Sequence, residues 1–276
     1  TWLYYTLLRC EQLTGKKPWS EAWIMGYGLD EKGMKMSKSK GNAIDPLPLI
    51  EKLGADTFRF WSASEINHGH DFRCNEQKIE SNKKFLSKLW NVSRFLSSFP
   101  VIESGTLTAL DKWVLSELDN LVKECKKGYD EYNFFIPAIA IREFTWNLFA
   151  AHYIEMVKAR AYGIGFSDEE RDGAIFTLHK TLSTILKLLA PITPFITEHL
   201  WKILYSKESI HKQKQVEPEN IETQSDITKE ITEFNSKVWN EKKSQSLSLK
   251  DSIKIEIPKI LEPFKKDLKS MHNLVD

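Results

Sequence analysis

The sequence predicts a mostly α-helical protein, in which the end of an α/β unit leads into an antiparallel helical bundle and then into a small α+β tail. Helix and strand patterns alternate through residues 1–66. From about residue 75 onward, apolar residues recur at helical spacing for about 130 positions. Hydrophobic residues make up 41% of the 276-residue chain and charged residues 28%, which suits a folded core and argues against intrinsic disorder.

Composition excludes several classes of protein. Lys and Arg number 39 against 38 Asp and Glu, so a strongly basic polyanion binder is excluded, although a local basic face is not. Cys10, Cys74 and Cys125 are far apart and form no CxxC pair, which argues against a disulfide scaffold or a zinc knuckle and fits a reducing cytoplasm. No apolar run approaches the roughly 18 residues of a membrane span. Because the chain begins at Thr1 within a helical pattern, we expect it to be a piece of a longer protein.

The first 66 residues predict short alternating elements. Gly15 and Pro18 end a first helix, and the apolar run 22–25, which two glycines follow, predicts a buried strand. Asp45 before Pro46 is typical of a helix start. The expected elements are a helix over 1–13, a buried strand within 19–29, a lysine-rich loop over 30–41, a helix from 45, and a short helix over 55–64.

The next segments predict the helices of the bundle. A proline or a capping pattern marks several of their ends, as at Ser167 and Glu170, where a serine precedes a glutamate by three residues. The helix that contains Trp146 is apolar on nearly all sides, so we expect it to be central and Trp146 to fill the core. The expected helices are 76–99, 108–129, 137–161, 167–189 and 195–205.

The remaining sequence predicts a linker and a small module. Residues 206–225 are polar, with isolated aliphatic residues and a proline, and are expected to form a mobile linker. Beyond it we expect an amphipathic helix over 226–243, an alternating strand over 252–257 and a short helix over 263–274. The predicted domains are 1–66, the bundle 67–205, the linker 206–225 and the C-terminal α+β module 226–276, whose completeness is left open.

The lysine-rich loop is the stretch that points most directly to chemistry. Four lysines fall within 32–40 with no acidic residue among them, and Gly33 and Gly41 bracket them as hinges. A flexible cationic loop suits a polyphosphate whose charge changes during a reaction, although lysine runs alone are more often solvated surface. The loop follows a glycine-ended predicted strand and precedes a capped helix. This order predicts a position at the carboxyl edge of a sheet, where α/β proteins bind ligands.

The residues of this loop resemble a known family. The run KMSKSKGN at 35–42, followed by IDPLPLIEKLGADTFRF at 44–60, resembles the second signature of the class I aminoacyl-tRNA synthetases, in the subgroup for branched aliphatic amino acids. Within that subgroup, residues 70–95 resemble valyl-tRNA synthetases, most of all in the run Lys88-Leu89-Trp90-Asn91. The resemblance covers residues 1–205 well and the tail poorly.

The resemblance implies a Rossmann-type catalytic fold that ends near residue 66, and a role for the loop in forming valyl-adenylate. In this reaction the carboxylate of valine attacks the α-phosphorus of ATP, which is used with Mg²⁺, and pyrophosphate leaves. By resemblance, Lys38 is the main catalytic residue that stabilises the departing phosphates, and Lys35 assists it. The implied ATP-binding residues are Gly26, Lys35, Met36, Ser37, Lys38 and Ser39.

The resemblance also implies that the bundle binds the anticodon stem-loop of valine tRNA. Basic residues outnumber acidic ones along the predicted helix 76–99, and lysines beside an aromatic ring can hold phosphates while an unstacked base packs on the ring. The alternatives are a core position for Phe95 and a merely solvated face for the lysines. The candidate anticodon-binding residues are Lys83, Lys84, Lys88, Asn91 and Phe95.

Other parts of such an enzyme are missing from the sequence. The first class I signature, His-any-Gly-His, and the inserted editing domain are absent, so we expect this chain alone to be inactive. The expected partners are ATP, valine tRNA, and valine, whose pocket lies mostly outside the chain. We expect a cytoplasmic monomer with no structural metal and no membrane contact. The alternatives are a fragment of an isoleucyl-tRNA synthetase and a stand-alone tRNA-binding module.

Overall fold

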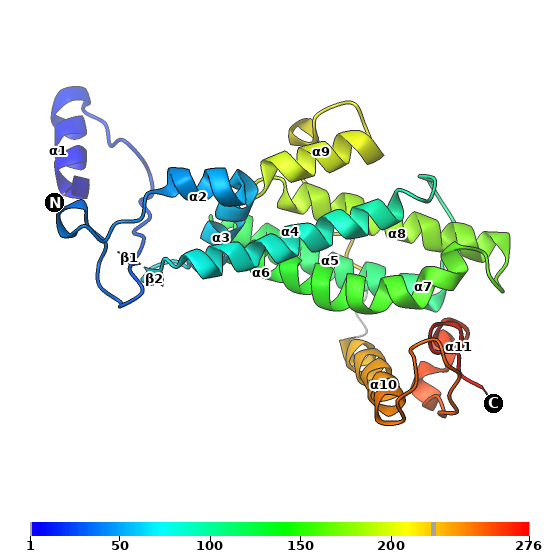
Figure 1. Ribbon diagram of the computed structural model, residues 1–276. Coiled ribbons are helices and arrows are strands. Elements are labelled where there is room, and N and C mark those ends of the chain that lie inside the picture. The colour runs from blue at the N-terminus through cyan, green and yellow to red at the C-terminus, as the bar shows by residue number, and fades with distance from the viewer. Residues whose placement is uncertain (1, 222–224, 276) are drawn as a thin grey trace.

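The N-terminal region contains two short paired strands and several helices. A computed structural model describes residues 2–221 and 225–275 of the chain. Helix α1 (Trp2–Thr14) stands apart at one end of the molecule and buries none of its residues (Figure 1). An irregular segment leads to strand β1 (Gly28–Leu29), which pairs in parallel with β2 (Phe72–Arg73). Between these strands lie helices α2 (Pro46–Leu53) and α3 (Ala55–Glu65).

The expected buried strand over 19–29 is wrong except at its end. Only β1 is paired as a strand, and Trp23, Ile24 and Met25 are 44%, 74% and 44% exposed. A strand is buried only when neighbouring strands or helices cover its faces. Within the described ranges the only strand beside this segment is β2, so the apolar run has no sheet to enter.

The bundle is helical, as predicted, and its helices run back and forth along one axis (Figure 1). The π-helical segment η2 (Phe144–Tyr153) joins α6 to α7 in one continuous helix, so the predicted helix 137–161 is correct in extent but not in hydrogen-bonding pattern. The other elements are α4 (Glu76–Leu96), α5 (Ala109–Asp130), α6 (Phe135–Glu143), α7 (Ile154–Ala161), α8 (Asp168–Leu189) and α9 (Pro194–Leu204).

Capping residues begin two of the helices at the positions that the sequence predicts. The backbone N–H of Ser167 donates to the Glu170 carboxylate at 2.8 Å, and the N–H of Glu170 donates to the Ser167 hydroxyl at 3.3 Å, which completes the expected capping box. Asp45 caps α2, because its carboxylate accepts the N–H of Leu47 at 3.0 Å. Both caps join residues two or three positions apart, so spacing alone locates them.

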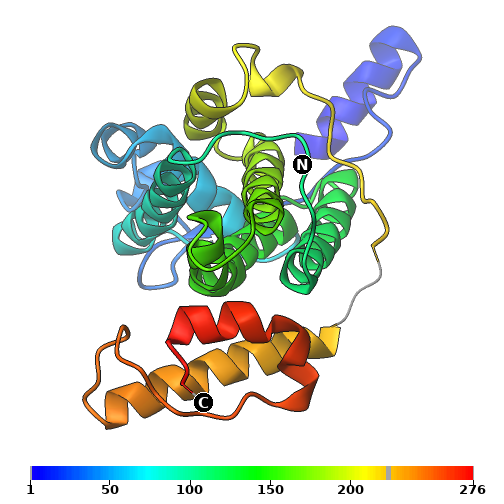
Figure 2. The same ribbon diagram turned by 90° about the vertical axis from the view of Figure 1, so that its right-hand side faces the viewer.

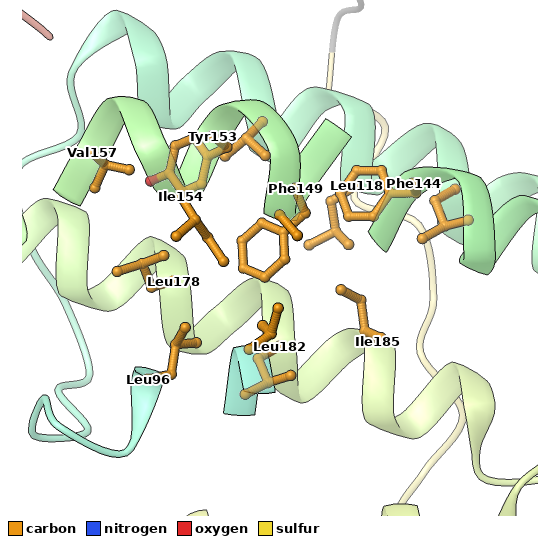
Figure 3. Packing of buried hydrophobic residues seen from close by; sticks show 14 of the residues in the cluster. Leu96, Leu118, Phe144, Phe149, Tyr153, Ile154, Val157, Leu178, Leu182 and Ile185 are labelled. Carbon is orange, nitrogen blue, oxygen red and sulfur yellow. The ribbon is translucent and has the colours of Figure 1, made fainter. Parts of the chain in front are cut away.

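The core of the bundle is built around the helix that runs through η2. Phe149 and Tyr153 have no exposed surface, and Figure 3 shows Phe149 pointing toward Leu182 of α8 with Ile185 beside it. Each such side chain removed from water stabilises the fold by about 1.5–3 kcal/mol. The prediction that this helix is central is therefore confirmed.

The C-terminal residues pack against one side of the bundle, as Figure 2 shows. They comprise α10 (Ser225–Ser244), the 3₁₀ segment η4 (Lys259–Phe264) and α11 (Lys265–His272), and Phe234, Leu261 and Leu268 share one apolar core with the bundle. The predicted strand 252–257 is wrong, because within the described ranges it forms a single bridge, from Ile253 to Leu274.

The described part of the predicted linker, residues 206–221, lies along the bundle. It contains the 3₁₀ turn η3 (Ile210–Lys212), and further along the Asp119 carboxylate of α5 accepts the backbone N–H of Ile221 at 3.0 Å. Lys126 of α5 also lies 3.5 Å from the Glu217 carboxylate. The domain boundaries proposed from the sequence stay a prediction.

A buried ionic cluster joins the tail to the bundle. Arg160 of α7, which has no exposed surface, donates to both carboxylate oxygens of Asp111 at 2.7 and 2.8 Å and to Asp267 of α11 at 3.0 Å. The Tyr153 hydroxyl also donates to Asp111 at 2.7 Å. One guanidinium therefore serves two buried carboxylates, and burial raises the pKa of Asp267 to about 6.

This raised pKa predicts a pH dependence of stability. The folded chain holds the Asp267 proton more tightly than the unfolded chain, whose carboxyl has the ordinary pKa of 3.8. The contribution of Asp267 is therefore fully present below pH 3.8 and is lost as the pH rises to about 6, which amounts to at most about 3 kcal/mol. In urea unfolding, we expect the free energy of unfolding of the parent chain, relative to that of Asp267→Asn, to fall by this amount as the pH rises. Identical pH profiles for the two chains would contradict the expectation.

Within residues 2–221 and 225–275, no helix combines the length and the apolar composition needed to cross a membrane. In the same ranges, no three His, Cys, Asp or Glu side chains gather as metal ligands would. Cys10, Cys74 and Cys125 are unpaired thiols, and burial raises the pKa of Cys74 and Cys125, which keeps both protonated.

Candidate functional site

The lysine-rich loop is folded around the side chains of Asp30 and Asn42. The Asp30 carboxylate accepts the backbone N–H groups of Lys32 at 3.0 Å and Met34 at 2.8 Å, and the Asn42 amide donates to it at 2.8 Å. These hydrogen bonds, that of Asn42 first, lower the pKa of Asp30. The amide oxygen of Asn42 accepts the N–H of Ser37 at 2.9 Å. The two ends of the loop are thereby held together.

Met36 anchors the middle of the loop. Its backbone N–H donates to the carbonyl of Gly28 at 2.9 Å. Its side chain packs against a small apolar cluster at the entrance to the bundle, which consists of Leu49, Leu53, Trp61, Cys74 and Ile79. This packing gives Met36 a structural role, and its contact with ATP stays a prediction.

The residues after this anchor lie in solvent. Lys38 and Lys40 belong to the short helix η1 (Lys38–Lys40), which ends at Gly41 with a φ of 65°. Both lysines are exposed, and neither has an ion-pair partner in the described parts of the chain. An exposed ammonium without an acidic partner is available to an added anion.

The other polar residues of the loop already have partners within it. The Lys35 ammonium lies over the Tyr27 ring, 3.6 Å from its centroid, a cation–π contact. The hydroxyls of Ser37 and Ser39 form a hydrogen bond of 2.7 Å. Lys38 is therefore the least engaged of the four residues Lys35, Ser37, Lys38 and Ser39, whose contacts with ATP stay predictions.

Gly26 has a structural reason to be glycine. A Cβ at this position would lie 2.0 Å from the carbonyl oxygen of His70, so any side chain would collide with that backbone. The close approach lets Tyr27 donate its N–H to the Asp71 carboxylate at 2.7 Å and accept the N–H of Phe72 at 3.1 Å. At Gly26 it is therefore the chain itself that approaches closely, and a contact of Gly26 with ATP stays a prediction.

The motif downstream of the loop ties α3 to the bundle. The Asp56 carboxylate accepts the N–H of Ile196 at 2.6 Å, at the first turn of α9, and burial raises the pKa of Asp56. Arg59 donates to the carbonyls of Ile192 at 2.8 Å and Pro191 at 3.0 Å, just beyond α8. The sequence identified Asp56 and Arg59 as part of a signature but gave no sign of these contacts, which join positions more than a hundred residues apart.

A second candidate site lies on the exposed face of α4. Lys83, Lys84, Lys88 and Asn91 line an open groove together with Trp146 of η2, and Glu80 and Ser87 complete the lining. Lys83, Lys84 and Lys88 have no ion-pair partner within residues 2–221 and 225–275. By contrast, Lys78, nearer the start of the same helix, pairs with Glu65 at 3.1 Å. The unpaired lysines give the groove a net positive charge.

The groove lining includes Trp146 but not Phe95, whose contact with the anticodon stays a prediction. Phe95 is half-buried and lies outside the groove lining, with its ring 5.3 Å from that of Phe99 and 6.4 Å from that of Tyr162. Trp146, which the sequence assigned to the core, is 36% exposed and lines the groove. The expectation that Trp146 fills the core is wrong, because a helix that is apolar on nearly all sides still leaves one side uncovered, and Trp146 lies there.

The protein combines a lysine-rich loop suited to phosphate binding with a helical bundle that carries a positively charged groove. This arrangement is expected of a class I aminoacyl-tRNA synthetase. The family model described as tRNA synthetases class I (I, L, M and V) matches residues 1–75. The model described as the anticodon-binding domain of tRNA ligase matches residues 111–257, through the predicted linker and into the tail. The chain therefore belongs to the family of anticodon-binding domains of tRNA ligases.

Valine–tRNA ligases are among the proteins that the chain resembles. The chain is 40% identical to that of Aeropyrum pernix over 99% of its own length and 34% of the relative's. It is 42% identical to that of Pyrobaculum aerophilum over 100% of its length and 35% of the relative's. The chain thus spans about a third of these proteins. The predicted resemblance to valyl-tRNA synthetases is confirmed, and the isoleucyl alternative is not favoured.

Similarity to a solved structure supports the fold. LeuRS from Agrobacterium radiobacter K84, solved as a ternary complex with tRNA and LeuAMS, superposes with a TM-score of 0.60 at 20% sequence identity. The alignment covers 79% of this chain and 26% of that protein. At this identity the likeness concerns the arrangement of helices alone.

Proposed function

We propose that this chain acts as part of a valine–tRNA ligase, in which the lysine loop binds the phosphates of ATP during valyl-adenylate formation and the bundle binds the anticodon stem-loop of valine tRNA. The observation that carries the proposal is the exposure of Lys38, a cation that has no acidic partner in the described residues. It lies on a loop that Asp30 and Asn42 hold in place. The similarity to valine–tRNA ligases over 99% of the chain supports valine as the amino acid.

The proposed chemistry depends on where negative charge develops. When the carboxylate of valine attacks the α-phosphorus, charge builds on the bridging oxygen and on the departing pyrophosphate. Lys38 accelerates this step if it contacts those oxygens more closely in the transition state than in the ground state. Lys35 assists once its ammonium leaves the Tyr27 ring. Gly26, Met36, Ser37 and Ser39 form the remaining proposed contacts with ATP.

Magnesium is proposed to enter with ATP, bound by the oxygens of the nucleotide. Magnesium is commonly held by one or two carboxylates together with the phosphates of a substrate. Within residues 2–221 and 225–275 no three acidic, histidine or cysteine side chains gather around a common point. The monomeric state remains a prediction, as does the cytoplasmic location, which the three unpaired cysteines favour.

The proposal is tested by ATP–pyrophosphate exchange with the full-length natural protein. We expect exchange that depends on valine and is far weaker with isoleucine. Exchange driven mainly by isoleucine would overturn the choice of amino acid. The chain of 276 residues by itself is expected to give no exchange. If the natural product were this short chain and bound valine tRNA tightly without forming adenylate, the stand-alone module would be the better description.

The anticodon role predicts how binding of valine tRNA depends on salt. Lys84→Ala and Lys88→Ala in the full-length protein are each expected to weaken binding and to reduce the slope of log K against log salt by about 0.7–1. Lys237→Ala, an exposed lysine of α10, serves as the matched control and is expected to change neither quantity. Equal affinities and slopes for all these variants would remove the α4 face from the proposed RNA site.

A further inference from the structure

We propose that Trp146 is a stacking platform for an unpaired base of the bound RNA, in the groove that it shares with the lysines of α4. This inference rests on the proposed anticodon role of the bundle and names the side chain that receives a base. It moves that role from Phe95, the aromatic residue suggested by the sequence, to a residue on a different helix.

Its exposure sets Trp146 apart from the aromatic residues that follow it in η2. Phe149 and Tyr153, in the same π-helical segment, have no exposed surface and belong to the core. Trp146 belongs to the same segment and is 36% exposed. Since π-helical turns are uncommon and occur often at functional sites, the presence of one beneath this tryptophan agrees with a binding role.

Within residues 2–221 and 225–275, the indole of Trp146 takes part in no ring stacking, cation–π contact or hydrogen bond. The other tryptophans of the bundle are engaged: the Trp90 ring stacks on His199 with centroids 5.7 Å apart and planes at 14°, and Trp113 donates to the Thr228 hydroxyl at 2.8 Å. An exposed indole without a partner is typical of an interface residue that meets its partner on binding.

The side chains beside the indole are suited to binding one nucleotide of a single-stranded loop. Lys83, Lys84 and Lys88 supply positive charge for phosphates, and the Asn91 amide offers both a donor and an acceptor for a base edge. Glu80 also lines the groove, but three lysines outnumber it. A base in a duplex is stacked on both faces and cannot cover the indole, whereas an unpaired base can. The occupant is therefore an unpaired nucleotide of RNA.

Phe95 is less suited to receive a base. Its ring already packs against the rings of Phe99 and Tyr162, and the Lys158 ammonium lies 5.6 Å from its centroid. A base could reach only the part of the ring that these neighbours leave exposed. Trp146 offers a larger ring with no such competition.

The test compares two exposed tryptophans of the same bundle in the full-length protein. Trp146→Leu is expected to raise the Kd for valine tRNA roughly tenfold with an unchanged salt slope, because stacking involves no charge. Trp90→Leu, at a position that is 42% exposed in the parent chain, is expected to leave the Kd unchanged. A Kd for Trp146→Leu within twofold of the parent value, while Lys84→Ala weakens binding, would overturn the inference and leave the proposed function intact. If the lysine variants also bound normally, the proposed function itself would fail.

A second measurement uses milder variants that keep an aromatic ring. Stacking of a base on an indole quenches its fluorescence, so RNA is expected to quench the parent protein more than Trp146→Phe. Trp90→Phe is the control and is expected to retain the full quench. An equal quench in the parent and in Trp146→Phe would show that no base lies on this indole. This readout does not depend on how well the leucine variant folds.

Discussion

Replacing Lys38 with alanine in the full-length protein is expected to slow valyl-adenylate formation by about 10²–10³-fold, or roughly 3–4 kcal/mol of transition-state stabilisation. The side chain is exposed and makes no contact on which the loop depends. Met36 and the pair Asp30–Asn42 still hold the loop when the Lys38 side chain is removed. The substitution is therefore expected to slow the reaction and to leave the fold of the loop intact. Valine-dependent ATP–pyrophosphate exchange measures it.

Lys40 provides the matched control for this experiment. It belongs to the same short helix, is also exposed, and lies just outside the KMSKS run. Lys40→Ala is expected to retain most of the exchange activity. A loss below about threefold for Lys38→Ala, or equal losses for the two variants, would contradict the assignment of Lys38 as the main catalytic lysine.

Arg160→Met is expected to destabilise the folded chain by about 3–5 kcal/mol, since it leaves two buried carboxylates without their cation. Arg160 has no exposed surface and binds Asp111 through two hydrogen bonds of 2.7 and 2.8 Å. It also contacts Asp267 of α11 at 3.0 Å, so the substitution removes one of the contacts between the tail and the bundle. Urea unfolding at neutral pH gives the free energy of unfolding.

Arg171 supplies the comparison on the surface. Its side chain is 37% exposed and lies 2.7 Å from Asp168, an ion pair that water screens. Arg171→Met is expected to change the free energy of unfolding by less than about 1 kcal/mol. If Arg160→Met lowered the free energy of unfolding no more than Arg171→Met does, the buried cluster would not supply the stability that we assign to it.

The sequence predicted best the features that depend on near neighbours along the chain. The capping box at Ser167 and the cap at Asp45 follow from residues two or three positions apart. The helices of the bundle follow from an apolar repeat that each helix carries by itself. The lysine loop was also found, because its residues are consecutive.

The features that the sequence analysis missed depend on partners that are distant along the chain, or on which side of a helix the packing leaves exposed. The run 22–25 has the composition of a buried strand, but only β2 lies beside the end of its segment in the described ranges. Arg160 finds its two carboxylates 49 and 107 positions away. Trp146 belongs to a helix that is apolar on nearly all sides, and no local pattern marks it as a residue that lies at the surface.

The contacts of α3 have a mechanical consequence. Asp56 and Arg59 grip the two sides of the corner between α8 and α9, one through the start of α9 and the other through the carbonyls that precede it. The corner between α8 and α9 is therefore braced by α3, and a tilt of α9 against α8 is opposed by the hydrogen bonds of Asp56 and Arg59. A displacement of this corner by a bound macromolecule would therefore reach α3, the second helix after the lysine loop, through these hydrogen bonds.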